Sequence, residues 1–175
     1  AWAMLAVPYL AGALIGALNR VRPDAGALQA GNEAATLVLG LAGLLLLFLG
    51  RPPLMLLLKR RAVNGNFGGG AWPLAAGSAV FTIPGLAVFW GLMLAGGYGA
   101  LAWMGLAGLL LFALNTSFAL RRRERTAAGE FAGILMLTMS APLGSYLGRG
   151  DLALEAIWLW MLCGLYFGAS IFFVK

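Results

Sequence analysis

The feature that most constrains this chain is a succession of long apolar runs separated by short polar connections. A helix of about 18 or more apolar residues is long enough to cross the hydrocarbon core of a bilayer, which is about 30 Å thick. Six such runs cover approximately residues 2–18, 32–50, 72–94, 100–120, 126–147 and 152–174. We therefore expect an all-α fold, a polytopic transmembrane helical bundle that forms a single domain over residues 1–175.

The composition supports the same class of protein. Hydrophobic residues make up 62% of the chain and charged residues 10%, whereas soluble domains carry roughly a quarter charged residues. A water-soluble surface cannot be built from so few charges. The lipid bilayer is therefore the expected partner of most of the surface.

The basic residues are distributed unevenly among the connections. The larger group follows the second, fourth and sixth runs, and comprises Arg51, Lys59, Arg60, Arg61, Arg121, Arg122, Arg123, Arg125 and Lys175. The smaller group lies in the other connections, and comprises Arg20, Arg22 and Arg149. Cytoplasmic connections are enriched in Lys and Arg, so this bias predicts that both ends of the chain lie inside the cell. The net charge of +6 is explained in this way, and a nucleic-acid partner is not expected because the basic residues alternate with apolar runs and not with aromatic residues.

The end of the second run leaves two alternatives open. Arg51, Pro52 and Pro53 interrupt the apolar sequence, which resumes from Leu54 to Leu58. Proline breaks or kinks a helix. The helix is either kinked and runs on to Leu58, or these residues lie along the membrane interface.

Ligands for a redox cofactor or a metal are scarce. The chain has no histidine and a single cysteine, Cys163, which lies among apolar residues. Imidazole-ligated haem, the usual zinc sites and disulfides all need residues that are missing from this sequence. We expect no cofactor, and we interpret Cys163 as a small buried side chain.

Acidic residues lie near the ends of the predicted spans. Glu33 and Glu155 lie within about one turn of the outer boundary, and Glu130 about one turn from the inner one. A proton relay or an ion pathway usually places an acid deeper in the membrane. The sequence therefore disfavours a pump.

Three glycine pairs have the spacing that allows close helix packing. They are Gly12 and Gly16, Gly129 and Gly133, and Gly164 and Gly168. With 26 glycines in the chain, some of these spacings are expected by chance. They indicate packing within the bundle and do not establish a dimer.

The densest polar group lies where the fourth and fifth runs meet the cytoplasmic side. It comprises Asn115, Thr116, Ser117, Arg121, Arg122, Arg123, Glu124, Arg125 and Glu130. One interpretation is a polar pocket for an anionic phospholipid head group, because guanidinium groups bind phosphate oxygens bidentately. The other is a membrane anchor whose arginines extend to the lipid phosphates. The candidate site that we name comprises Asn115, Arg121, Arg122, Arg123, Glu124, Arg125 and Glu130, with no catalytic residue among them.

Several short motifs occur together in a recognisable order. They are Ala1-Trp2-Ala3-Met4-Leu5, Val7-Pro8-Tyr9-Leu10, Pro53-Leu54-Met55, Leu58-Lys59-Arg60, Asn115 followed by Arg121 to Arg125, Tyr166-Phe167-Gly168-Ala169-Ser170, and Phe173-Val174-Lys175. In these motifs the chain resembles the YwiC-like family of bacterial integral membrane proteins. The resemblance implies a protein of the bacterial plasma membrane and names no reaction. Because family members have a His-Gly pair before the Ala-Trp and continue beyond the last lysine, we expect this chain to be part of a longer protein.

Two classes of function follow. The first is a non-enzymatic membrane protein, either a small-solute permease or a membrane accessory subunit, because polar residues are sparse in the middle of the spans. The second is a lipid-acting enzyme that resembles the UbiA-type prenyltransferases, whose helical bundles hold a prenyl diphosphate with aspartates and Mg²⁺. Only Asp24 and Asp151 are available here, both on the predicted outer side and far apart in sequence. This argues against the enzyme.

Overall fold

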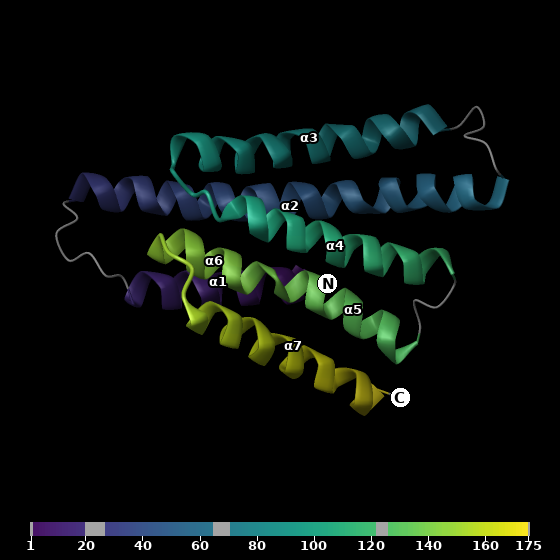
Figure 1. Cartoon of the computed structure of the whole chain (residues 1–175). Coiled ribbons are helices and arrows are strands. Elements are labelled where there is room, and N and C mark those ends of the chain that lie inside the picture. The colour runs from purple at the N-terminus through teal and green to yellow at the C-terminus, as the bar shows by residue number, and fades with distance from the viewer. Residues whose placement is uncertain (1, 20–26, 65–70, 122–125, 175) are drawn as a thin grey trace.

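The chain folds into a bundle of helices that run back and forth along one long axis (Figure 1). The computed structural model describes residues 2–19, 27–64, 71–121 and 126–174. Within these ranges the helices are α1 (Trp2–Leu18), α2 (Ala27–Asn64), α3 (Ala71–Ala95), α4 (Leu101–Leu120), α5 (Ala127–Thr138), α6 (Ser140–Arg149) and α7 (Leu154–Val174). The described part of the chain contains no strand. The expected all-α class is confirmed.

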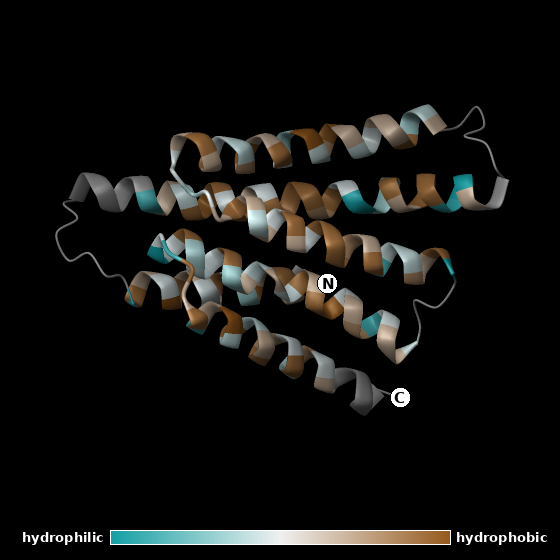
Figure 2. Cartoon of the chain, viewed as in Figure 1, coloured by the Kyte–Doolittle hydropathy of each residue, from teal (hydrophilic) through white to brown (hydrophobic). Residues whose placement is uncertain are grey.

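Several of these helices are long and apolar enough to span a membrane. The stretches that qualify are Glu33–Ala62 in α2, Ala71–Ala95, Leu101–Leu120, and Ala127–Arg149, which combines α5 and α6. Outside the helix contacts their surface is apolar, as the hydrophobic colouring of α3 and α4 shows (Figure 2). Trp72, Trp90 and Trp103 are all more than 60% exposed. Such a surface is stable only against lipid, so the chain is a helical membrane protein.

Helix α2 runs without interruption through Pro52 and Pro53, which decides between the two alternatives for this segment. Its 38 residues correspond to about 57 Å at 1.5 Å per residue, well beyond the thickness of the hydrocarbon core. The prolines remove two backbone hydrogen bonds, but α3 packs against α2 at this point. Ser78 Oγ donates a hydrogen bond of 3.2 Å to the carbonyl of Gly50. A Cβ at Gly77 would lie 3.9 Å from Pro53.

The fifth predicted run is helical, but it is divided at Met139 into α5 and α6. Pro142 explains the division, because it has no N–H and its ring collides with the carbonyl four residues earlier, at Thr138. The Thr138 hydroxyl donates 2.9 Å back to the carbonyl of Ile134, a contact that bends helices. The apolar pattern of the fifth run had not indicated this division.

The centre of the bundle is the pair α1 and α6, which pack backbone against backbone. A Cβ at Gly12 or Gly16 would overlap the carbonyl oxygens of Ala141 and Ser145, respectively. A Cβ at Gly144 would overlap the carbonyl oxygen of Tyr9. The predicted glycine pair of α1, Gly12 and Gly16, therefore packs against α6, which has a glycine pair of the same spacing, Gly144 and Gly148. This second pair was not among those predicted from the sequence. Glycine ridges of this kind bring membrane helices into close contact.

Hydrogen bonds between helices fix the register of this centre. Tyr9 is buried, and its hydroxyl donates 2.6 Å to the carbonyl of Leu37 in α2. The Ser140 hydroxyl donates 2.8 Å to the carbonyl of Leu5. Tyr9 and Ser140 each satisfy a carbonyl on a neighbouring helix, as buried polar groups generally require.

Helix α7 packs on the outside of α5. A Cβ at Gly164 would lie 3.2 Å from Leu135, and one at Gly168 would lie 3.1 Å from Phe131. The indole N–H of Trp160 donates 3.1 Å to the carbonyl of Leu135. The predicted glycine pair of α7 therefore lies in a helix interface. Gly133, from the predicted pair in α5, has only the side chain of Asn115 near it, at 3.8 Å.

Candidate functional site

The C-terminal end of α4 presents two buried polar side chains to two different neighbours. Asn115 and Thr116 are 6% and 8% exposed. The Asn115 amide nitrogen lies 3.9 Å from the sulfur of Met136 in α5. The Thr116 hydroxyl lies 3.6 Å from the sulfur of Met55 in α2. Thioether sulfur is a weak acceptor, so both donors are only poorly satisfied by these contacts.

The polar residues that follow have mainly local roles. The Ser117 hydroxyl donates 2.7 Å to the carbonyl of Leu114 in its own helix. Arg121 is exposed, and its backbone N–H closes α4 on the carbonyl of Ser117 at 3.1 Å. Arg122, Arg123, Glu124 and Arg125 lie outside the described residues. The interpretation of this segment as a head-group site therefore stays a prediction.

Glu130 lies at the start of α5. It belongs to the first turn of that helix and is half-buried. Thr126 caps the same turn, since its hydroxyl accepts a hydrogen bond of 3.2 Å from the backbone N–H of Gly129. An acidic side chain is favourable near a helix N-terminus because of the helix dipole. The position of Glu130 thus has a structural explanation in α5.

Arg51 belongs to this end of the bundle, but it lies deeper than the sequence suggested. The sequence analysis placed it in a connection, whereas it is in the interior of α2. Met55 lies one turn further along α2 than Arg51 and contacts Thr116 of α4. Thr116 in turn lies five residues before Arg121, at the end of α4. At 1.5 Å per residue these steps place Arg51 about 13 Å inside that end. A hydrophilic band part-way along α2 is visible in Figure 2.

The side of α2 on which Arg51 lies is also defined. Half-buried residues on one side of α2 recur every three or four positions. They are Leu37, Leu41, Leu44, Phe48, Arg51 and Met55. The first three pack against the core formed by α1, α3, α4 and α6, and Met55 meets α4. Arg51 is half-buried and continues this inward stripe.

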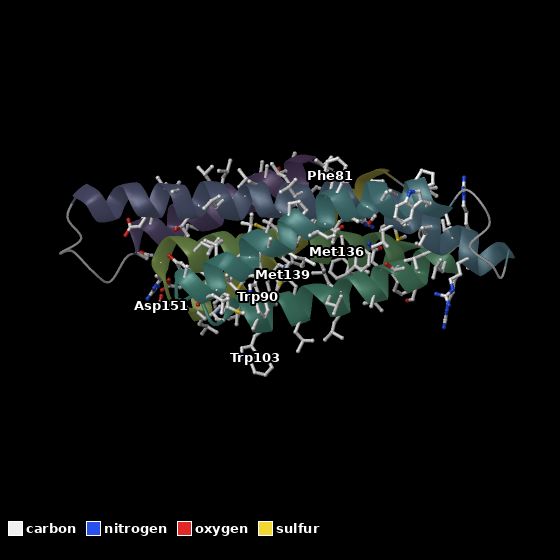
Figure 3. The ribbon with its side chains drawn as sticks, turned by 90° about the horizontal axis from the view of Figure 1, so that it is seen from above. Phe81, Trp90, Trp103, Met136, Met139 and Asp151 are labelled. Atoms are coloured by element: carbon white, nitrogen blue, oxygen red, sulfur yellow. The ribbon has the colours of Figure 1, made fainter. Side chains whose placement is uncertain are left out.

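A separate ionic cluster closes the opposite end of the bundle. Arg149 Nε lies 2.7 Å from a carboxylate oxygen of Asp151, and its Nη1 lies 2.8 Å from Glu155. The Asn19 amide lies 3.5 Å from the same Glu155 oxygen. Gly150 makes the turn between α6 and α7 with a φ of 90°, a conformation that favours glycine. Figure 3 places Asp151 at this end.

This cluster bears on metal-dependent chemistry. Asp151 is already paired with Arg149, and Asp24 lies outside the described residues. Within residues 2–19, 27–64, 71–121 and 126–174, no three His, Cys, Asp or Glu side chains come close enough to hold a metal ion.

Figure 3 shows Met136 and Met139 among the helices and Trp103 pointing away from them.

The geometry of a tightly packed, mainly apolar bundle can be compared with known proteins. The family model described as YwiC-like protein matches residues 1–145. The chain belongs to the YwiC-like family. The resemblance inferred from the short motifs is therefore confirmed.

One relative in this family comes from Bacillus subtilis (strain 168) and is named "Uncharacterized protein YwiC". It is 33% identical over 75 residues, which cover 43% of this chain and 31% of the relative. The chain thus matches about a third of the length of that YwiC protein. No solved structure matches the chain.

Proposed function

We propose that this chain is the transmembrane part of a multi-pass bacterial plasma-membrane protein that acts without covalent chemistry, as a membrane accessory subunit. Six crossings, with both ends inside the cell, form the proposed topology. The antiparallel order of the helices supports it, with α5 and α6 counted as one crossing (Figure 1). So does the bias of the Lys and Arg residues toward one end of the bundle.

The observation that carries the choice of an accessory subunit is the closed centre of the bundle. Gly12 and Gly144 bring the backbones of α1 and α6 into contact, and residues 140–148 of α6 are all buried. A transport pathway lies along helices that move apart or line a cavity. A pair held by backbone contact along its whole interface favours a rigid scaffold.

A small-solute permease is the second candidate, and one observation favours it. Arg51 is a charged residue at membrane depth on the inward side of α2, and such residues often mark a solute or ion path. A prenyltransferase of the UbiA type receives no such support, because the described aspartate, Asp151, is engaged by Arg149.

Reconstitution of the purified full-length protein into liposomes separates these functions. For an accessory subunit, uptake of labelled phosphate, sugars and amino acids should equal that of empty liposomes. Uptake above that level would replace the accessory subunit with a permease. Prenyl transfer that depends on Mg²⁺, measured in the same preparation, would contradict both.

A further inference from the structure

The inner half of the seam between α2 and α4 combines one cation with two poorly satisfied donors. Arg51 and Met55 lie one turn apart on the inward side of α2. Thr116 contacts Met55, and Asn115, next to it in α4, contacts Met136 of α5. Met55 and Thr116 meet across the seam, Arg51 lies on the same side of α2 as Met55, and Asn115 borders the seam.

From this arrangement we infer that Arg51 and Thr116 form an intramembrane binding site for a phosphate group, with Asn115 at its edge. A phosphate oxygen accepts strong, charge-assisted hydrogen bonds from a guanidinium and good ones from a hydroxyl or an amide. The thioether sulfurs that Thr116 and Asn115 now contact are weak acceptors by comparison. Exchange of sulfur for an oxyanion would therefore improve the hydrogen bonds of Thr116 and Asn115.

Met55 makes this exchange inexpensive. Methionine is unbranched and has three rotatable bonds, so it can leave one position and fill another at low cost. A guanidinium has five N–H donors, so Arg51 can keep a contact within the bundle while it binds an oxyanion.

The depth of the site restricts its ligand. The site lies about 7 to 13 Å inside the end of α4, as measured by helical rise, below the level of Lys59 and Arg60. The phosphate group belongs either to an anionic lipid drawn into the seam or to a free anion that enters from the same end. The cytoplasmic location of this end is part of the proposed topology. The inference therefore rests on the proposed function only for the side of the membrane from which the ligand enters.

Two substitutions test the site with a matched control. Arg51→Gln and Arg60→Gln each remove one positive charge from α2, but Arg60 is exposed near the end of the helix. Thr116→Val keeps the shape of the side chain and every charge, and removes the hydroxyl. The two probes are labelled inorganic phosphate and vesicles of phosphatidylcholine with phosphatidylglycerol, used on the full-length protein.

We expect one of two results for the wild-type protein. It binds labelled phosphate at equilibrium, or it retains phosphatidylglycerol when the protein is released from the vesicles for native mass spectrometry. Arg51→Gln should weaken that binding by about tenfold or more, and Thr116→Val by several-fold, as for the loss of a charged and a neutral hydrogen bond. Arg60→Gln should stay within about twofold, because its charge is screened by solvent. Retention of the lipid identifies a head group as the source, and phosphate binding without lipid retention identifies a free anion.

Three results would overturn the site. They are binding of neither probe by the wild-type protein, equal losses in Arg51→Gln and Arg60→Gln, and unchanged binding in Thr116→Val. The last variant decides the question if Arg51→Gln does not fold. Phosphate uptake into liposomes would refute the accessory subunit and leave the binding site intact. Binding that does not depend on Arg51, without uptake, would refute the binding site and leave the accessory subunit intact.

Discussion

The contact between α1 and α6 can be tested by adding a single methyl group at Gly144. Its Cβ would overlap the carbonyl oxygen of Tyr9 and lie 3.0 Å from the backbone nitrogen of Ala13. Both neighbours are backbone atoms in the centre of a helix, so neither can rotate away. The two helices must separate to accept the methyl group.

The size of the effect follows from the required separation. At Gly148 the corresponding Cβ would lie 2.8 Å from the carbonyl oxygen of Ala13, against about 3.4 Å for ordinary contact. That position needs a shift of several tenths of an ångström, and Gly144 needs more. Overpacking of a core costs about 1 to 3 kcal/mol, so we expect a loss of about 2 kcal/mol for Gly144→Ala and less for Gly148→Ala.

Gly105→Ala in α4 is the matched control. A Cβ there would have no atom within 4 Å, and alanine favours a helix over glycine by up to about 1 kcal/mol. Unfolding in mixed detergent micelles with increasing dodecyl sulfate, followed by tryptophan fluorescence, measures both variants. Equal stability of Gly144→Ala and Gly105→Ala would show that α1 and α6 do not touch as described.

Three further substitutions test separate contacts in the same unfolding assay. Ser140→Ala removes the hydrogen bond to Leu5 and should cost about 0.5 to 1.5 kcal/mol; no loss would mean that the two helices are not in this register. Trp160→Phe removes the indole donor to Leu135 and should cost about 0.6 kcal/mol or somewhat more. Trp158 is an exposed neighbour, so Trp158→Phe should not change the stability. Equal effects of the two substitutions would argue against the contact of α7 with α5. Arg149→Gln should lower the free energy of unfolding by less than about 1 kcal/mol, because its partners Asp151 and Glu155 are 57% and 58% exposed. A loss several times larger would indicate a buried cluster.

The long-range outline of the protein could be predicted because it depends on properties that are summed along the sequence. Apolar runs set the helices, and the charged connections set their approximate ends. The pairing of Gly12 with Gly144 could not be predicted, because glycine spacing shows that a helix can pack closely but not which helix it meets. The close contact requires both ridges at the same depth, which only the three-dimensional arrangement fixes.

Arg51 shows where the sequence was misleading. Its place before Pro52 and Pro53 suggested the end of a helix, since proline usually ends one. Packing of α3 across the prolines overrides that preference. The signal that could have identified Arg51 is the recurrence of inward residues from Leu37 to Met55, which is readable in the sequence once α2 is taken as continuous.

The candidate site was predictable only in part. Asn115 was recognised because an amide within an apolar run needs a partner. Its neighbour Met136 lies in a different run and carries no polar signal. The sequence therefore pointed to the end of α4 that carries Asn115 and Thr116, but it could not show that these two residues face different helices.

The measurement that tests the central claim most directly is the accessibility of single cysteines in intact cells. With Cys163 replaced by alanine, one cysteine is placed at Leu152 and another, in a second variant, at Ala62, both of which are exposed positions. We predict that a membrane-impermeant maleimide labels the Leu152→Cys protein in intact cells and the Ala62→Cys protein only after the cells are opened. Labelling of both positions from the same side would contradict the account of helices that cross the bilayer with their arginine-rich end inside.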